Sequence, residues 1–200
     1  IHHKMNDIAN GKDNVNALDT LLAAERAVYT YGYHIYFTSN HDENSWAGTE
    51  FERMGDGNKA FAALCATLDG MPLMYSGQEE PLKKRLSFFE KDTIPFKNYD
   101  YEEFYTTLNA LKKKNQALWN GDQGGLSRRI NTSETVYAFM REMNGDKLIG
   151  VFNLSPKPQK TTLQVPIHNM NIVFTDDELT LDTGQNINLG PWEFFLFSSK

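Results

Sequence analysis

The sequence predicts two architectures in succession: α/β units built around a parallel sheet, followed by an all-β antiparallel sandwich with Greek-key connections. Up to about residue 120, segments with helical spacing alternate with short, apolar, β-prone segments. Two of these apolar segments run into polar loops, which is typical of strands in a parallel sheet. From Leu126 onward, the segments are short, β-prone and separated by turn residues, which favours the sandwich.

Composition and charge restrict the class of protein. The 200 residues carry a net charge of −6, which argues against a nucleic-acid partner, since binding phosphates requires clustered Lys and Arg. No apolar stretch approaches the ~20 residues needed to cross a bilayer, so no membrane span is expected. The single cysteine, Cys65, excludes an intrachain disulfide and a cysteine metal cluster, and we expect a buried thiol. The sequence begins at Ile1 without an initiator Met or a signal-type segment, which indicates a processed, trimmed or cut chain.

The α/β part is predicted to run from two helices into a strand and a polar loop, then through a helix and a strand into a second polar loop and a last helix. Gly11 is expected to follow the end of the first helix, and Asn14 to cap the second. The predicted helices cover residues 2–11, 14–29, 58–69 and 101–119, and the predicted buried strands cover residues 34–38 and 71–75.

The β part is predicted from segments at residues 126–131, 135–142, 147–154, 161–166, 171–174 and 193–198. The pair Asn144-Gly145 between the second and third segments is a strong hairpin signal. The boundary between the two parts falls near residues 120–125, which gives predicted domains 1–122 and 123–200.

Asn40, His41 and Asp42 are the most informative polar residues, because they directly follow the predicted strand 34–38. In parallel α/β folds, active sites are built at the carboxyl ends of the strands. A carboxylate such as Asp42 can stabilise a cationic transition state, and an imidazole and an amide can bind sugar hydroxyls. The alternative is a hydrophilic turn in which Asn40 and Asp42 bond only to the local backbone.

Other chemistries are less well supported. Retaining glycoside cleavage needs two carboxyl groups about 5–5.5 Å apart, and nothing in the sequence marks Glu79 or Glu80 as the second. No Gly-x-Ser-x-Gly elbow surrounds Ser39, which disfavours a Ser-His-Asp triad. The adjacent His2 and His3 could be a metal site or the remnant of a tag; without a third ligand nearby they are weak evidence for a metal, so no metal site is predicted.

Two ordered motifs resemble the α-amylase family of glycoside hydrolases, family 13. Residues 37–42, Phe-Thr-Ser-Asn-His-Asp, resemble the end of that family's seventh barrel strand. Residues 70–79, with the pattern Gly-x-Pro-x-x-Tyr-x-Gly-x-Glu, resemble the eighth. The helix 101–119 resembles the last barrel helix, and the β part resembles the family's C-terminal sandwich. The resemblance therefore implies an α/β barrel fragment, the last βα units of a TIM-type (β/α)8 barrel from helix 6 to helix 8, in residues 1–122.

The function implied by the resemblance is that of a C-terminal fragment of an α-amylase-like retaining glycoside hydrolase. Such enzymes cleave α-glucosidic bonds in starch, glycogen or maltooligosaccharides. By residue match, Asp42 corresponds to the family carboxylate that stabilises the transition state, while His41 and Asn40 belong to the substrate-binding set. The family's nucleophile and acid/base come from earlier strands that no stretch here matches, so the fragment alone is expected to be inactive.

The implied partner is an α-glucan oligosaccharide or polysaccharide. No cofactor is evident in this chain, and a calcium ion, if the protein uses one, would belong to the part of the barrel outside it. Open barrel edges would favour self-association. Localisation stays open, although the resemblance somewhat favours export to the periplasm, the cell surface or the medium.

The alternative function is a non-catalytic β-sandwich module for carbohydrate binding or domain packing. Its sugar-stacking residues would be Trp46, Trp119, Trp192 and Tyr137. Exposed neighbouring aromatic side chains would favour this module, and buried ones would favour the hydrolase fragment.

Overall fold

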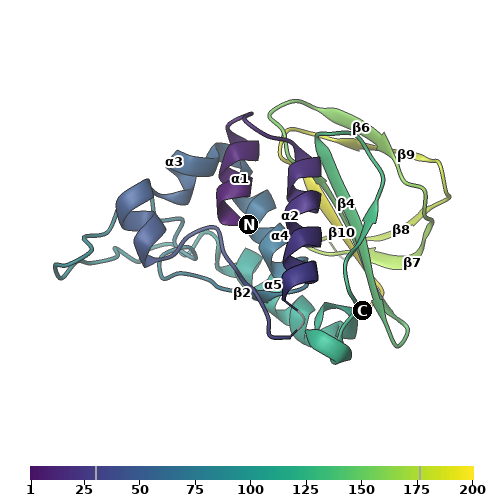
Figure 1. Cartoon of the computed structure of the whole chain (residues 1–200), viewed down its shortest axis with the longest axis horizontal. Helices are drawn as coiled ribbons and strands as arrows, with labels where there is room; N and C mark the ends of the chain where they lie inside the picture. The colour runs from purple at the N-terminus through teal and green to yellow at the C-terminus, as the bar shows by residue number, and fades with distance from the viewer. Residues whose placement is uncertain (30, 176) are drawn as a thin grey trace.

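The structure is a computed structural model that describes residues 1–29, 31–175 and 177–200. Helices α1, α2, α4 and α5 lie between the looped segment that carries α3 and the β-strands of the second half (Figure 1). The helices are α1 (His2–Ala9), α2 (Val15–Val28), α3 (Glu50–Met54), α4 (Asn58–Thr67) and α5 (Glu102–Lys114). Within the described residues, no helix has both the length and the apolar character needed to cross a membrane.

The helix ends follow the predicted capping residues. Gly11 lies at a φ of 68°, and the amides of Gly11 and Lys12 bond to the carbonyls of Ile8 and Asp7. This pair of bonds is the Schellman arrangement, which satisfies carbonyls left free at a helix end. At the start of α2, the Asn14 side chain accepts a hydrogen bond from the Asn16 amide at 3.0 Å.

α4 is the central helix of the first half. Almost all of its side chains are buried, because its alanines allow close approach by neighbours on several sides. It packs against α5, β2 and the sandwich strand β5. Cys65 lies on this helix as the predicted buried thiol, with its Sγ 3.7 Å from the Met5 sulfur, and burial raises its pKa to about 12.

The two predicted strands of the first half pair in parallel, but they are shorter than expected. β1 (Ile35–Tyr36) pairs with β2 (Met71–Pro72) through two residues each. The prediction that both strands are buried is wrong for most side chains, since Ile35 is 52% exposed and Met71 is also exposed. Tyr36 packs into the core. No described element covers the opposite face of the β1–β2 pair, so the apolar side chains on that face are exposed to solvent.

The second half forms two antiparallel sheets. Six strands lie in the order β3-β4-β5-β10-β7-β8, and β6 pairs with β9 in a second sheet. The strands are β3 (Arg128–Ile130), β4 (Val136–Met143), β5 (Asp146–Asn153), β6 (Gln159–Thr162), β7 (Ile167–Ile172), β8 (Glu178–Leu181), β9 (Asn186–Leu189) and β10 (Phe194–Ser198). The chain leaves the large sheet after β5, returns for β7 and β8, and then pairs β9 with β6, a Greek-key type of return.

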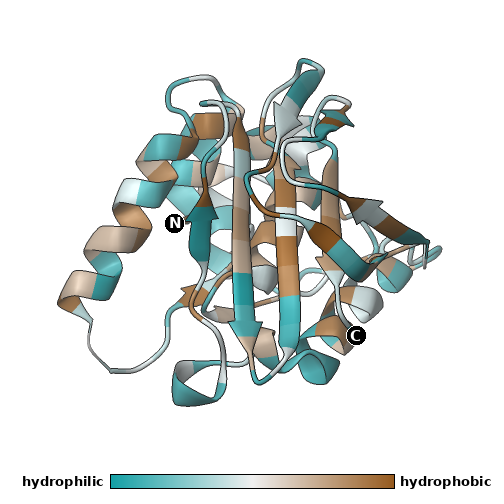
Figure 2. Ribbon diagram, turned by 90° about the vertical axis from the view of Figure 1, so that its right-hand side faces the viewer, coloured by the Kyte–Doolittle hydropathy of each residue, from teal (hydrophilic) through white to brown (hydrophobic). Residues whose placement is uncertain are grey.

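The two sheets share one apolar core, which confirms the predicted sandwich. Inward-facing side chains of both sheets, including Val151, Ile167 and Leu189, belong to one buried cluster. In Figure 2 the hydrophobic stretches concentrate along the long central strands that face the viewer. The hairpin between β4 and β5 turns at Asn144 and Gly145, both with positive φ, as the Asn-Gly signal predicted.

A buried arginine joins the two halves. Arg141 extends from β4 and is 1% exposed. Its guanidinium donates to the carbonyls of Thr67, Leu68, Trp119 and Gly125, which belong to the end of α4 and the connecting segment. Because the end of α4 and the sandwich meet around this side chain, the two halves pack as one body here.

Candidate functional site

Asn40, His41 and Asp42 lie together beyond the carboxyl end of β1, where they open a helical turn rather than continue the strand. The side chains of His41 and Asp42 are 67% and 57% exposed, and His41 Nε2 lies 3.6 Å from an Asp42 carboxylate oxygen. Asn40 Oδ1 accepts a 2.7 Å hydrogen bond from the Glu43 amide, so Asn40 orders the turn that presents the other two. The arrangement therefore offers an open carboxylate and an imidazole to solvent.

The segment between β1 and the turn is held by a buried polar network that no sequence pattern indicated. The carboxylate of Glu50, on α3, accepts a hydrogen bond from Thr38 at 2.7 Å and one from Gln78 at 2.7 Å. Thr38 follows β1 and Gln78 follows β2, so one carboxylate ties together the segments that leave both strands. Burial raises the pKa of Glu50, while the hydrogen bonds from Thr38 and Gln78 oppose that rise.

Glu79 and Glu80, in the loop that follows β2, accept hydrogen bonds from backbone amides. Glu79 accepts from the Gly77 amide at 2.8 Å. Glu80 accepts from the amides of Lys97 and Tyr99, both at 2.9 Å, and these bonds lower its pKa. Glu80 thereby anchors the long segment between β2 and α5, which supports a structural role for this carboxylate.

The Ser39 hydroxyl makes no hydrogen bond to His41. Its hydroxyl oxygen is buried and has no hydrogen-bond partner among the residues that the structure describes. A serine nucleophile would have to lie within hydrogen-bond reach of its base. The geometry agrees with the absence of a nucleophile elbow around Ser39.

Exposed aromatic side chains gather beside His41. The Phe88 ring stacks on the His41 ring with centroids 5.9 Å apart and lies tilted against Trp46 at 5.3 Å, while the Phe89 ring is 4.8 Å from Phe88. Trp46 is 63% exposed, so this aromatic group faces outward beside His41. Such rings can stack on the apolar faces of sugars.

The other aromatic residues considered from the sequence differ in their environments. Tyr137 is buried in the core and Trp192 packs against it, whereas Trp119 is exposed. Only part of this set therefore has the exposure that a sugar platform requires.

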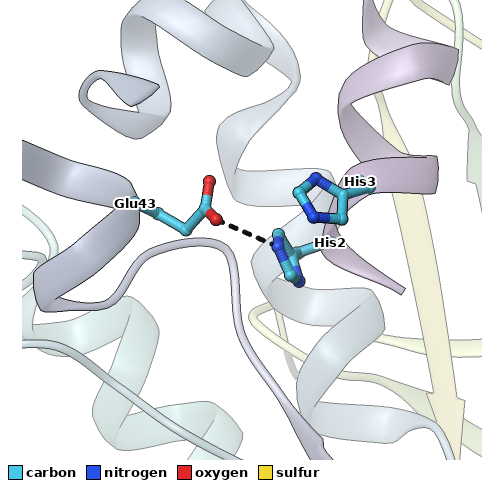
Figure 3. A group of neighbouring side chains, drawn as sticks. All are labelled: His2, His3 and Glu43. Atoms are coloured by element: carbon cyan, nitrogen blue, oxygen red, sulfur yellow. Dashed lines mark hydrogen bonds and ion pairs between the residues drawn. The ribbon is translucent and has the colours of Figure 1, made fainter. Parts of the chain in front are cut away.

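A second polar group lies on the other side of the same turn. The side chain of Glu43 points away from solvent toward His2 and His3 at the start of α1 (Figure 3). His2 Nε2 lies 3.1 Å from Glu43 Oε1. Burial and the neighbouring His3 lower the pKa of His2, although Glu43 acts to raise it. No sequence pattern indicates this group, because Glu43 lies 41 positions after His2.

The β part of the chain matches a known protein family. Residues 128–196 match a family model described as "Maltogenic Amylase, C-terminal domain". A β/α-amylase from Paenibacillus polymyxa is 28% identical over 106 residues, which cover 52% of this chain and 8% of that protein. The resemblance to the C-terminal part of a family 13 amylase is thereby confirmed.

Solved amylase structures share the fold over nearly the whole chain. A noncanonic maltogenic α-amylase from Thermotoga neapolitana is similar with a TM-score of 0.81 and 22% identity, covering 98% of this chain and 48% of its own. An α-amylase from Lactobacillus plantarum is similar with a TM-score of 0.79 and 17% identity, covering 99% and 46%. The protein AmyP, solved in complex with maltose, is similar with a TM-score of 0.74 and 16% identity, covering 100% of this chain and 48% of its own. The chain therefore spans about half the length of these three solved chains.

Proposed function

We propose that this chain is the C-terminal part of an α-amylase-like retaining glycoside hydrolase that cleaves α-glucosidic bonds in starch, glycogen or maltooligosaccharides. Residues 1–122 would supply the last βα units of a (β/α)8 barrel, and residues 123–200 the C-terminal sandwich. The observation that carries the proposal is the parallel pair β1–β2, with an exposed Asp42 just beyond the carboxyl end of β1.

Asp42 would act electrostatically in the intact enzyme. Its carboxylate is unengaged by backbone donors in the described residues, unlike those of Glu79 and Glu80. Placed beside the sugar ring, it would stabilise the positive charge that develops on the oxocarbenium-like transition state. His41 and Asn40 would bind the hydroxyls of the same sugar, with Asn40 also holding the turn.

The chain alone would lack hydrolytic activity. Retaining cleavage requires a nucleophile and an acid/base about 5–5.5 Å apart around one bond. Among the described residues, the acids nearest to Asp42 in the sequence are committed elsewhere: Glu43 to His2, and Glu50 to Thr38 and Gln78. The two remaining catalytic carboxylates would come from strands outside this chain.

The test is Asp42→Asn in the full-length protein that contains this segment. We expect turnover of a chromogenic maltoside to fall by at least about 10²-fold, the scale of losing one transition-state-stabilising group, with a modest change in KM. Asp122→Asn is the matched control, because Asp122 is exposed and its side chain makes no hydrogen bond or ion pair with the described residues. Near-normal turnover of Asp42→Asn would remove Asp42 from this role.

A second candidate is a non-catalytic module that binds α-glucans. It is favoured by the exposed aromatic group of Trp46, Phe88 and Phe89, and by the maltose bound to AmyP, a protein that shares the fold. Calorimetric titration of the 200-residue chain with maltotriose separates the candidates. Binding that is lost in Trp46→Ala, without hydrolysis, would support the module.

A further inference from the structure

His2, His3 and Glu43 converge although they come from two separate segments of the chain. His2 and His3 occupy the first turn of α1, and Glu43 lies in the turn after β1 (Figure 3). Their candidate ligand atoms all lie within 4.8 Å of one another. Two imidazoles and a carboxylate form a donor set of the type found in open zinc sites, where water takes the fourth position. We propose that these three side chains bind a divalent transition-metal ion, with zinc as the best match to the donor set.

Two of the three ligands already have the spacing that zinc requires. With bonds of 2.0–2.1 Å to nitrogen and oxygen, neighbouring ligands in a tetrahedral site are about 3.4 Å apart. The 3.1 Å separation of His2 Nε2 and Glu43 Oε1 is close to that value. Only the exposed His3 has to move to complete three-fold coordination, and its exposure leaves the remaining side open to water.

Surrounding contacts hold the two better-buried ligands in place. The His2 ring stacks on Phe37, with centroids 4.7 Å apart. The second carboxylate oxygen of Glu43 lies 3.8 Å from the Arg53 guanidinium, and its backbone amide donates to Asn40. Contacts of this kind orient metal ligands and preserve their geometry.

The choice of ion follows from the ligand chemistry. Imidazole nitrogen suits zinc, copper and nickel, whereas calcium and magnesium prefer oxygen ligands. The Arg53 cation and the positive end of α1 both oppose a bound cation. We therefore expect weaker binding than in a closed structural zinc site. A bound ion would fasten α1 to the turn that carries Asp42, since Glu43 directly follows that residue.

The test is calorimetric titration of the 200-residue chain with zinc chloride, and with calcium chloride in parallel. We expect one zinc ion per chain and no heat from calcium. Glu43→Gln keeps the size of the side chain but removes its charge, and it should weaken zinc binding by more than the about 10–100-fold that loss of an outer contact costs. His168→Gln is the matched control, because His168 is a surface histidine of the sandwich paired with Asp182.

Unchanged zinc affinity in Glu43→Gln, or an equal loss in His168→Gln, would overturn the proposal. A second measurement guards against loss of α1 in the variants. Cobalt bound to the wild-type chain should give the strong visible absorption of tetrahedral coordination. That band should disappear in His3→Gln, whose side chain is exposed in the native fold and whose circular dichroism should match wild type. A cobalt spectrum that survives His3→Gln unchanged would likewise contradict the site.

Discussion

The strand pair β1–β2 and the sandwich strands β4–β5 are built from similarly apolar sequences but have opposite surroundings. β1 and β2 pair through two residues each, and Ile35 and Met71 are exposed. β4 and β5 pair through eight residues each, and most of the side chains at their centres are buried. β4 and β5 are covered on both faces: side chains such as Phe152 pack in a cluster shared with the helices, and side chains such as Val151 pack in a cluster shared with the second sheet. Parallel strands such as β1 and β2 also need covering layers, but one face of this pair has none among the described residues.

Stability is therefore concentrated in the second half of the chain and in the helices that pack against it. α4 and one face of the large sheet share one buried apolar cluster, the two sheets share a second, and Arg141 links α4 to the sandwich through four carbonyls. The strands that lead to Asp42 contribute little to that core except through Tyr36. The candidate site therefore lies in the part of the chain with less buried apolar surface, where the hydrogen bonds of Glu50 hold the segments after β1 and β2 together.

The largest expected effect is at the junction of the two regions. Arg141→Ala should lower the free energy of unfolding by about 4 kcal/mol, because it leaves four carbonyls without a donor at about 1 kcal/mol or more each. Urea unfolding followed by tryptophan fluorescence measures the loss. Arg128→Ala, at an exposed position of β3, should be nearly neutral. A loss below about 1 kcal/mol for Arg141→Ala would show that the junction does not depend on these bonds.

A matched pair of isoleucines tests the comparison directly. Ile149→Ala, at a fully buried position of β5, should cost about 2–5 kcal/mol through lost burial and a cavity. Ile35→Ala makes the same chemical change at a side chain that is 52% exposed, and it should cost less than about 1 kcal/mol. Urea midpoints of the two variants provide the measurement. Equal losses would mean that β1 is covered in solution in a way that the isolated chain does not show.

The parts of the fold that the sequence predicted well are those decided by local chemistry. The Asn144-Gly145 turn, the Asn14 cap and the end of α1 at Gly11 follow from the residues themselves. β8 and β9 were missed, since each is only four residues long and alternates short polar and aliphatic side chains. The sixth predicted segment, 193–198, agrees with β10, whereas the fourth and fifth are displaced by a few residues from β6 and β7, because pairing between distant strands sets the limits of these two strands.

The candidate site was predictable only in part. The position of Asp42 after a parallel strand followed from the pattern of apolar and polar residues, although the turn is helical rather than extended. Glu50 and the approach of Glu43 to His2 depend on contacts between segments that are far apart in the sequence. Long-range geometry of this kind leaves no periodic signal in a single sequence.

Exposed apolar side chains on the β2 segment should promote association between copies of the chain. Met74 is exposed next to Leu73, beside a short strand whose outer edge is unpaired in the described residues. Met74→Lys should lower the fraction of dimers and larger species measured by size-exclusion chromatography with light scattering. Leu126→Lys, at an exposed position after α5, is the control. If Leu126→Lys dissociates the chain and Met74→Lys does not, association proceeds through the connecting segment instead.

The smallest expected effect is a pH-dependent change in stability that has opposite signs for two acids on α3, Glu50 and Glu52. Burial raises the pKa of Glu50. When the pH rises above the ordinary pKa of a glutamate, the unfolded chain therefore loses the proton of this carboxyl group while the folded chain still holds it. Wild-type stability should therefore fall with rising pH relative to Glu50→Gln, by a Tm difference of about 2–4 °C, or about 1 kcal/mol for a chain of this length. Scanning calorimetry from pH 4 upward measures the difference.

Glu52 provides a control of opposite sign on the same helix. Its hydrogen bonds to the Arg85 side chain and the Thr49 amide lower its pKa to about 2. Its contribution is therefore present above the ordinary range of a glutamate and is lost as pH falls toward that value. Because Glu52 is exposed, salt screening keeps the contribution small. If Glu50→Gln instead loses stability relative to wild type as pH rises, the Glu50 charge stabilises Arg53 more than its burial costs. The polar support beneath Asp42 would then be ionic.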